Sequence, residues 1–253
     1  MERNFDVIIF GATGYTGKYA VRNAIKILKD MRWAVAGRNK SKLEDMLHDS
    51  GSKMNTDLSS VPIIIADVDD VKSIEEMVKQ AKVIVNCCGP YYLFGEVVIK
   101  ACVEYSTSHV DISGEAQFIE KIMLKYDSAA REKRIYIASC CGIESIPAEL
   151  GLFYIQEQFN GVVNSVDTYM RFYFEKGFKP TGPSLNFGTY HSAIHAIGAF
   201  FESQRLRRQL YPKPMPSFTP KLKNRLVHRE AAVRNRWCIP MIEPDQTIVM
   251  KQS

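Results

Sequence analysis

The stretch that decides the fold is residues 5–17, FDVIIFGATGYTG, in which an apolar run ends in three glycines spaced three apart. An apolar run without polar alternation is typical of a β-strand that is buried on both faces of a parallel sheet. The segment that follows, KYAVRNAIKILKD, repeats apolar side chains at helical spacing. The sequence therefore predicts a buried strand, a tight glycine turn and a helix, in that order.

Each glycine of this turn has a separate physical role. The first tolerates backbone angles that other residues avoid, and the missing side chain of the second lets a pyrophosphate approach the main chain. The third lets the helix and the strand pack closely. The start of the helix offers that anion free N–H groups and the positive end of a dipole. The alternative is a tight structural turn with no ligand. The expected cofactor-binding residues of the loop are Gly11, Thr13, Gly14, Tyr15, Thr16 and Gly17.

A long alternation of strands and helices follows this first unit. We expect strands at residues 6–10, 32–38, 61–68, 82–90, 109–113 and 134–140, with helices between them at 18–30, 41–49, 69–81, 95–106 and 115–133. Ser41 is the expected N-cap of the second helix. This order predicts an α/β fold with a doubly wound parallel sheet, a Rossmann-like dinucleotide-binding domain over residues 1–150.

The pattern changes after the sixth strand. Residues 146–159 predict a helix, 163–176 alternate like an antiparallel strand, and 189–210 predict one long helix. Residues 211–225 carry four prolines and predict a loop, and 245–253 begin another strand. We therefore expect residues 151–253 to form an incomplete second α/β domain, a partial substrate domain with a basic proline-rich loop. We also expect it to be less ordered than the first domain and to be cut first by proteases within 211–221.

The ends of the second, third and fourth strands indicate which dinucleotide is bound. An acid in the second strand would bind the ribose 2′-hydroxyl of NAD, but Arg38 stands there, with Lys42 close behind. Arginine matches a phosphate with a planar fork of donors, so NADP is expected and NAD is less favoured. A solvated basic loop is the alternative. Further expected cofactor contacts at the ends of the third and fourth strands are Asp67, Asn86, Cys87, Gly89 and Pro90.

Composition places the chain among globular proteins that are not secreted. Apolar residues make up 46% and charged residues 24%, and no apolar run is long enough to span a bilayer. The N-terminal apolar run is a strand and not a signal peptide, so we expect a chain that faces the cytosol with its six cysteines reduced. The net charge of the chain is +5, and the positive charge is concentrated in residues 205–236, which contain ten Lys or Arg residues and one acidic residue. That window is a solvated surface or a contact for anionic lipid heads, and no motif indicates nucleic acid.

Other catalytic patterns are absent or incomplete. None of the twelve tyrosines has a lysine four residues later, which excludes the usual pair of short-chain dehydrogenases. His191 and His195 share a helix face, but Ser192 stands where a zinc peptidase has glutamate, so no metal site is expected. The candidate proton donors near a nicotinamide are Tyr91, Tyr92, His109 and Glu115. The residue pattern does not choose between them, and no catalytic residue is assigned.

Several motifs taken together resemble one family. GATGYTG, WAVAGR, NCCGPY, GEVVIKAC, VDISGE and GIESIPAELG occur in this order, and their combination is similar to the saccharopine dehydrogenase-like oxidoreductases. The resemblance covers essentially the whole chain. It implies a dinucleotide-binding domain followed by a second α/β domain that continues beyond residue 253, so the chain is expected to be a C-terminally short member.

The resemblance also implies a function. It points to an NADP-dependent oxidoreductase that transfers hydride to or from a hydrophobic or lipid-related substrate. It further implies a peripheral place on the cytoplasmic face of a lipid droplet or another membrane, and a homodimer is one compatible assembly. The alternative is a dinucleotide-binding scaffold or sensor without turnover, associated with a membrane or lipid droplet.

Overall fold

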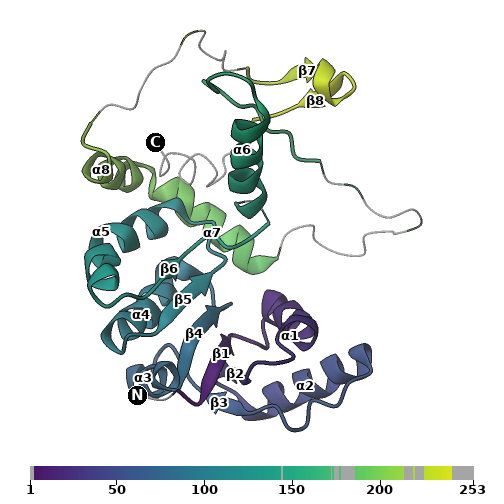
Figure 1. The fold of residues 1–253 in the computed structure, drawn as a ribbon, viewed down its shortest axis with the longest axis vertical. Helices are drawn as coiled ribbons and strands as arrows, with labels where there is room; N and C mark the ends of the chain where they lie inside the picture. Colours follow the sequence, from purple (N-terminus) through teal and green to yellow (C-terminus); the bar gives the residue numbers. More distant parts are fainter. Residues whose placement is uncertain are drawn as a thin grey trace.

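The structure, a computed structural model, describes residues 3–143, 145–171, 173, 177, 186–213, 219 and 225–240. Its centre is a six-stranded parallel sheet in the order β3-β2-β1-β4-β5-β6. The predicted doubly wound parallel sheet is therefore confirmed (Figure 1). The strands are β1 (Phe5–Phe10), β2 (Trp33–Gly37), β3 (Ile63–Ile65), β4 (Ala81–Asn86), β5 (Ser108–Asp111) and β6 (Ile137–Ala138).

Helices cover both faces of this sheet because successive strand residues point to opposite faces. Ile8 of β1 packs in a core cluster that includes Ile74 and Val98, whereas its neighbour Ile9 packs in another that includes Val21 and Leu43. Both faces are thus apolar, as the apolar run of residues 7–10 in β1 requires. The covering helices are α1 (Tyr15–Ile27), α2 (Lys40–Met54), α3 (Val71–Lys79), α4 (Tyr91–Glu104) and α5 (Ala116–Glu132).

The strand order sets where a ligand can bind. From β1 the chain moves outward to β2 and β3, then returns to place β4 on the other side of β1. The connections that leave β1 and β4 therefore diverge, and in doubly wound sheets ligands bind in the crevice outside the carboxyl ends of such a pair of strands. The glycine turn leaves β1 at this point, and the segment that follows β4 lies against it.

Several element boundaries in the sheet region differ from the prediction: α2 extends to Met54, β3 has only three residues, and α4 begins at Tyr91. Ser41 is not the N-cap of α2, because the Asn39 side chain accepts a hydrogen bond from the Lys42 backbone N–H at 3.0 Å and the helix begins at Lys40. The last strand is also shorter than predicted, with two residues, because the chain takes a positive φ at Arg134 and again at Cys140. Neither left-handed residue can continue a strand.

Residues beyond the sheet form helices and a hairpin. They are α6 (Ile146–Gln158), α7 (Phe187–Gly198), α8 (Phe200–Leu210), and β7 (His228–Glu230), the 3-10 helix η1 (Ala231–Val233) and β8 (Arg236–Cys238). The single helix predicted at 189–210 is wrong, because the chain breaks at Ala199 just after Gly198, a residue of low helix propensity. Residues 163–171 form no strand, and no strand of the described residues pairs with them. The strand expected at 245–253 and most of the proline-rich segment lie outside the described residues.

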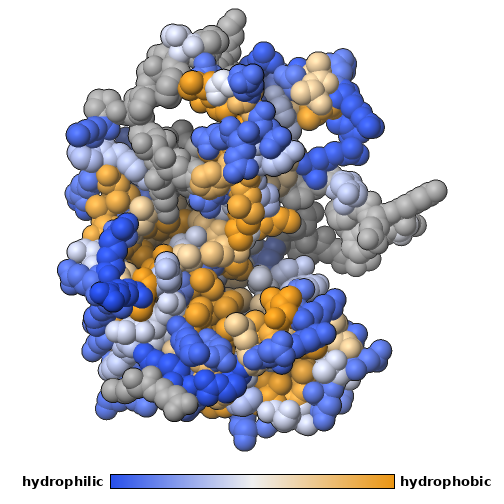
Figure 2. Space-filling view, viewed as in Figure 1, coloured by the Kyte–Doolittle hydropathy of each residue, from blue (hydrophilic) through white to orange (hydrophobic). Residues whose placement is uncertain are grey.

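The helices of this second part contact the sheet region in different ways. α8 packs on α5, with Leu206 buried and Arg207 Nη2 2.9 Å from Glu120 Oε1. α6 and α7 bury none of their residues, and apolar side chains gather on the surface across the middle of the molecule (Figure 2). No helix in the described part of the chain has the length and apolar character to cross a membrane. The division at residue 150 stays a prediction.

Candidate functional site

The glycine turn after β1 is built from two glycines that the fold itself requires. Gly11 has a φ of +75°, and a Cβ there would lie 2.9 Å from the backbone carbon of Cys87. A Cβ on Gly17 would lie 2.2 Å from the Gly11 carbonyl oxygen, so this glycine lets α1 pack against the turn. Both residues are therefore explained by contacts within the protein.

Gly14 differs from these two glycines. Its φ of −69° is open to any residue, it is exposed, and it is the N-cap of α1 without a side-chain hydrogen bond. An added Cβ would meet the Gly11 oxygen at 3.1 Å, a tight contact that a small shift relieves. The absent side chain leaves the first N–H groups of α1 open to an anion. Thr13 is half-buried beside it, whereas Tyr15 and Thr16 are exposed on the first turn.

The side chains expected to select the cofactor lie at the ends of β2 and β3. Arg38 follows β2 and is exposed, and within the described residues its guanidinium forms no ion pair. Burial raises the pKa of the Cys88 thiol, and the nearby charges of Arg38 and Asp67 act on it in opposite directions. These three residues, which follow β2, β3 and β4, therefore lie within electrostatic range of one another. Lys42 is exposed in the first turn of α2.

The segment after β4 lies against the glycine turn and is held by Asn86. The Cys87 backbone N–H donates to the Phe10 carbonyl oxygen at 2.8 Å. The Asn86 side chain is buried, and its Oδ1 accepts from the Cys88 N–H at 2.9 Å. Burial raises the pKa of the Cys87 thiol to about 11, which keeps it protonated at neutral pH. Gly89 is exposed, and Pro90 precedes the first residue of α4.

Glu115 joins three helices where β4 and β5 end. Its Oε1 accepts from the Tyr91 backbone N–H at 3.0 Å, and its Oε2 accepts from the Tyr92 backbone N–H at 2.7 Å. The Ser192 hydroxyl of α7 also donates to Oε1, at 2.8 Å. A buried carboxylate thus satisfies open N–H groups at the start of α4 and complements its dipole. The same carboxylate ties α7 to this end of the sheet.

A ring cluster lies beside Glu115. The Tyr92 hydroxyl is 3.0 Å from Nδ1 of His191, and the Tyr92 ring lies 3.8 Å from the ring of His195, centroid to centroid. Both histidines come from α7, which crosses the carboxyl ends of β4 and β5 (Figure 1). The cluster therefore lies on the side of the crevice where a doubly wound sheet holds the far end of a dinucleotide.

A buried polar network joins the ends of β4, β5 and β6. His109 Nε2 lies 3.4 Å from Asn86 Nδ2, and burial lowers the pKa of His109 to about 3. Asp111 accepts from the Ser113 N–H at 2.9 Å and from the Ser139 hydroxyl at 2.8 Å. Burial raises the pKa of Asp111 to about 6, against the effect of those hydrogen bonds. Their contacts assign both residues to holding the strand ends.

The ring cluster could not be assembled from the sequence. Tyr92 and Glu115 were candidate proton donors, but their partners His191 and Ser192 follow 99 and 77 residues later in the chain. The one available signal was the i, i+4 spacing of two histidines in an otherwise apolar helix. Within the described residues, no group of three or more His, Cys, Asp or Glu side chains is arranged for a metal ion.

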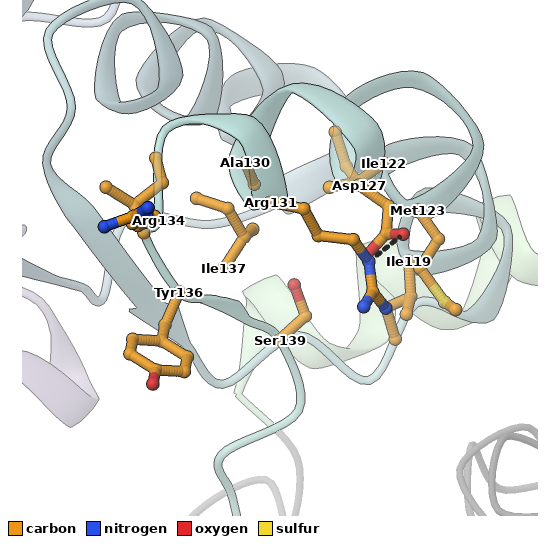
Figure 3. Close-up of a pocket in the computed structure, with 11 residues that line it drawn as sticks. Ile119, Ile122, Met123, Asp127, Ala130, Arg131, Arg134, Tyr136, Ile137 and Ser139 are labelled. Carbon is orange, nitrogen blue, oxygen red and sulfur yellow. Dashed lines mark hydrogen bonds and ion pairs between the residues drawn. The ribbon is translucent and has the colours of Figure 1, made fainter.

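Two cavities lie at the outer edges of the sheet and are separate from this site. One of about 440 Å³ lies between α5 and β6, where Arg131 is paired with Asp127 at 2.7 Å (Figure 3). The other, of about 600 Å³, lies between α2 and β3 and is lined by residues such as Leu47 and Leu58. No residue of the glycine turn or of the ring cluster lines either cavity.

The sheet region matches a known protein family. Residues 7–138 match the family described as saccharopine dehydrogenase NADP binding domain. The match spans β1 to β6 and therefore includes the glycine turn, Arg38 and Glu115.

Individual relatives extend the similarity along the chain. It is 37% identical to the saccharopine dehydrogenase-like oxidoreductase of Homo sapiens, over 99% of this chain and 59% of that protein. It is 36% identical to the lipid droplet localized protein of Caenorhabditis elegans, over 97% of this chain and 58% of that one. A trans-acting enoyl reductase of Mycobacterium bovis is 27% identical over 81% of this chain and 48% of its own length. The chain thus spans less than two thirds of the length of each of these relatives.

Proposed function

Because the chain belongs to the family of the saccharopine dehydrogenase NADP binding domain, we propose that it is the NADP-dependent part of an oxidoreductase that acts on a hydrophobic, lipid-related substrate. The cofactor predicted from the sequence, NADP, is confirmed by that family. The observation that carries the proposal is the open start of α1 at Gly14, with the unpaired Arg38 guanidinium at the end of the neighbouring strand.

The residues present fit an NADP molecule. Gly14 and the first N–H groups of α1 would hold the pyrophosphate, in the space that a side chain would fill. Arg38, with Lys42 nearby, would bind the 2′-phosphate, and Asp67 would approach the adenosine. The segment from Asn86 to Pro90 lines the path toward the nicotinamide. Asn86 acts by holding this segment, since its side chain is buried in contacts with Cys88 and His109.

The chemistry is a two-electron reduction or its reverse. When bound, the reduced cofactor supplies a hydride to one carbon of a polarised C=O or C=C bond. The protein's own task is to orient the substrate, to exclude water and to deliver a proton. α7 is positioned for the second of these tasks, because it crosses the carboxyl ends of β4 and β5 where the nicotinamide would lie.

The lipid-related substrate rests on two observations. One relative is named as a lipid droplet localized protein and another as an enoyl reductase. In addition, α6 and α7 expose large apolar side chains, including Leu150, Phe153 and Ile197. A hydrophobic substrate and a peripheral contact with a lipid droplet or membrane both suit such a surface.

A second candidate is NADP binding without turnover, as in a scaffold or sensor. One observation favours it: no residue of α6 or α7 is fully buried, so within the described part of the chain these two helices leave the ends of β4 and β5 incompletely covered. In this alternative the protein binds NADP through the same proposed contacts but does not transfer hydride.

Two measurements separate these functions. Binding of NADPH is followed by its fluorescence, and turnover is followed by loss of NADPH absorbance with a panel of long-chain enals, ketones and enoyl thioesters. The oxidoreductase requires tight binding together with turnover of at least one apolar compound. Tight binding with no turnover across the panel would move the assignment to a scaffold or sensor, and absence of binding would contradict both.

A further inference from the structure

Four candidate proton donors lie at or just beyond the carboxyl ends of β4 and β5, and three of them, Tyr91, His109 and Glu115, are buried. The Tyr91 hydroxyl is buried and donates to the Asn86 carbonyl oxygen at 2.9 Å. His109 has no exposed surface, and burial lowers its pKa to about 3, so it carries no transferable proton at neutral pH. Both Glu115 oxygens already accept backbone hydrogen bonds at the start of α4. Tyr92 is the remaining member.

Tyr92 has a different environment from the other three. It is half-buried, and its hydroxyl lies at the boundary between the sheet region and α7. The hydroxyl contacts His191 Nδ1 at 3.0 Å, and the ring lies against the ring of the exposed His195 at a tilt of 31°. A phenol in this position reaches both a substrate placed over the strand ends and a histidine that exchanges protons with solvent.

We propose that Tyr92 is the proton donor of the reaction and that His191 positions its hydroxyl, acting on an apolar substrate with a conjugated C=C or a C=O bond. The proposal rests on the proposed function. As the hydride reaches one end of that bond, the electron pair of the double bond moves to the other end. The Tyr92 O–H bond breaks, and its proton completes the reduced product. His191 then returns a proton from solvent to the phenolate.

The hydrogen bond with His191 directs the transferred proton. In the tautomer that carries its proton on Nδ1, His191 donates to the Tyr92 oxygen and leaves the phenol O–H free to point at the substrate. The developing phenolate is stabilised by the same hydrogen bond. His191 is therefore a positioning residue, and Tyr92 is the catalytic one.

The surrounding charges keep the Tyr92 proton in place before it is used. Burial raises the pKa of Tyr92 above its ordinary value, and the Glu115 carboxylate adds to this effect. The titratable groups that face it are Glu115, before α5, and His191 and His195, from α7. The phenol is therefore protonated at neutral pH, and the reaction rate falls only when the pH rises through its raised pKa.

The first test compares three proteins with NADPH and trans-2-decenal as the probe. Tyr92→Phe keeps the ring on His195 and should lower kcat by about 100-fold to 10,000-fold, the range for loss of a general acid. Its affinity for NADPH should stay within about twofold, since the hydroxyl makes no contact with the proposed nucleotide site. Tyr136→Phe, at a phenol that is 80% exposed at the edge of the sheet, is the matched control and should keep the parent rate.

The second test reads the hydrogen bond without turnover. The ultraviolet difference spectrum between the parent and Tyr92→Phe reports the titration of this one phenol, which should ionise above the ordinary tyrosine value of about 10. His191→Gln should shift that titration, lower kcat about tenfold and move the start of the alkaline rate loss by the same shift. A purely structural role of His191 would lower the rate without moving either pH value.

The possible failures are distinguishable. Tight NADPH binding with no turnover of trans-2-decenal or the wider panel by the parent would overturn the proposed function and this proposal with it. If the parent turns over the substrate and Tyr92→Phe keeps the same rate, the assignment of Tyr92 as the proton donor is wrong, and the proposed function stands. A Tyr92 titration that His191→Gln leaves unchanged would overturn the positioning role.

Discussion

The sheet region buries most of its apolar side chains, in full or in part, whereas the described part of the chain beyond it leaves most of them exposed. Residues 3–143 contain the three core clusters, and among the described residues beyond 143 Leu206 is the single buried apolar side chain. In the same part, exposed apolar residues occur on α6, on α7 and in the β7–β8 hairpin, where Trp237 is 66% exposed. The first region is held by packing on both faces of a sheet, whereas the second contacts it through the packing of α8 on α5 and through the polar contacts of α7 and α8.

This difference bears directly on the candidate site. The glycine turn, Arg38 and the segment after β4 belong to the packed region, so the proposed cofactor contacts are preorganised. The ring cluster is completed by α7, whose side chains form hydrogen bonds with Tyr92 and Glu115 of the sheet region. Cofactor binding should therefore depend on the first region alone, whereas proton delivery should depend on how the two regions meet.

The largest expected effect is a contrast in hydrogen exchange between the regions. Amides of α6 should exchange at least about a thousandfold faster than those of β1 and β4. A 13-residue helix without buried residues has little more than its own weak helical stability, whereas the central strands open only with the whole sheet. Mass spectrometry after peptic digestion measures both in one sample. Equally slow exchange in α6 would show that it is covered, and the contrast would be wrong.

A pair of glycine substitutions should sharpen the contrast. Gly17→Ala places a Cβ 2.2 Å from the Gly11 oxygen and should lower the free energy of unfolding by about 3 kcal/mol or more. Gly151→Ala in α6 meets nothing within 4 Å and should be neutral or slightly stabilising. Thermal unfolding of the two variants gives the comparison. A similar loss in both, or none in Gly17→Ala, would contradict the packing described for the turn.

A third glycine tests ligand binding without loss of the fold. Gly14→Val should lower the free energy of unfolding by only about 1 kcal/mol, since valine is a poorer N-cap than glycine. It should weaken NADPH binding by at least about a hundredfold, or about 2.7 kcal/mol, because its branches fill the space at the start of α1. Gly151→Val is the matched control and should bind like the parent. If folded Gly14→Val binds NADPH as tightly as the parent, the phosphate contact at this loop is wrong.

The sheet could be predicted from the sequence because its information is local. Apolar runs such as residues 6–10, each followed by a helix-periodic segment, specify buried parallel strands one at a time. The caps depend on which of several adjacent side chains reaches a free N–H, which is why Asn39 and not Ser41 begins α2. The strand predicted at 163–176 failed over residues 163–171 because alternation forms a strand only where a neighbour pairs with it.

The candidate site divides along the same line. The glycine turn and Arg38 lie within or directly after predicted strands, so their positions follow from the fold. The contacts of Glu115 with α4, and of Tyr92 with His191, depend on tertiary packing that joins distant segments. No local sequence pattern encodes these contacts. The break at Ala199, which separates α7 from α8, was likewise not predicted from the sequence.

The most direct test of the central claim is the affinity of the protein for NADPH and NADH, measured side by side by fluorescence titration. The parent should bind NADPH roughly tenfold to a hundredfold more tightly, because Arg38 forms a charge-assisted contact with the 2′-phosphate of about 1.5–3 kcal/mol. Arg38→Asp should remove or reverse this preference and leave NADH binding nearly unchanged. Arg208→Asp on α8, which changes the net charge equally, should keep the preference. Equal affinities of the parent for both cofactors would contradict the claim.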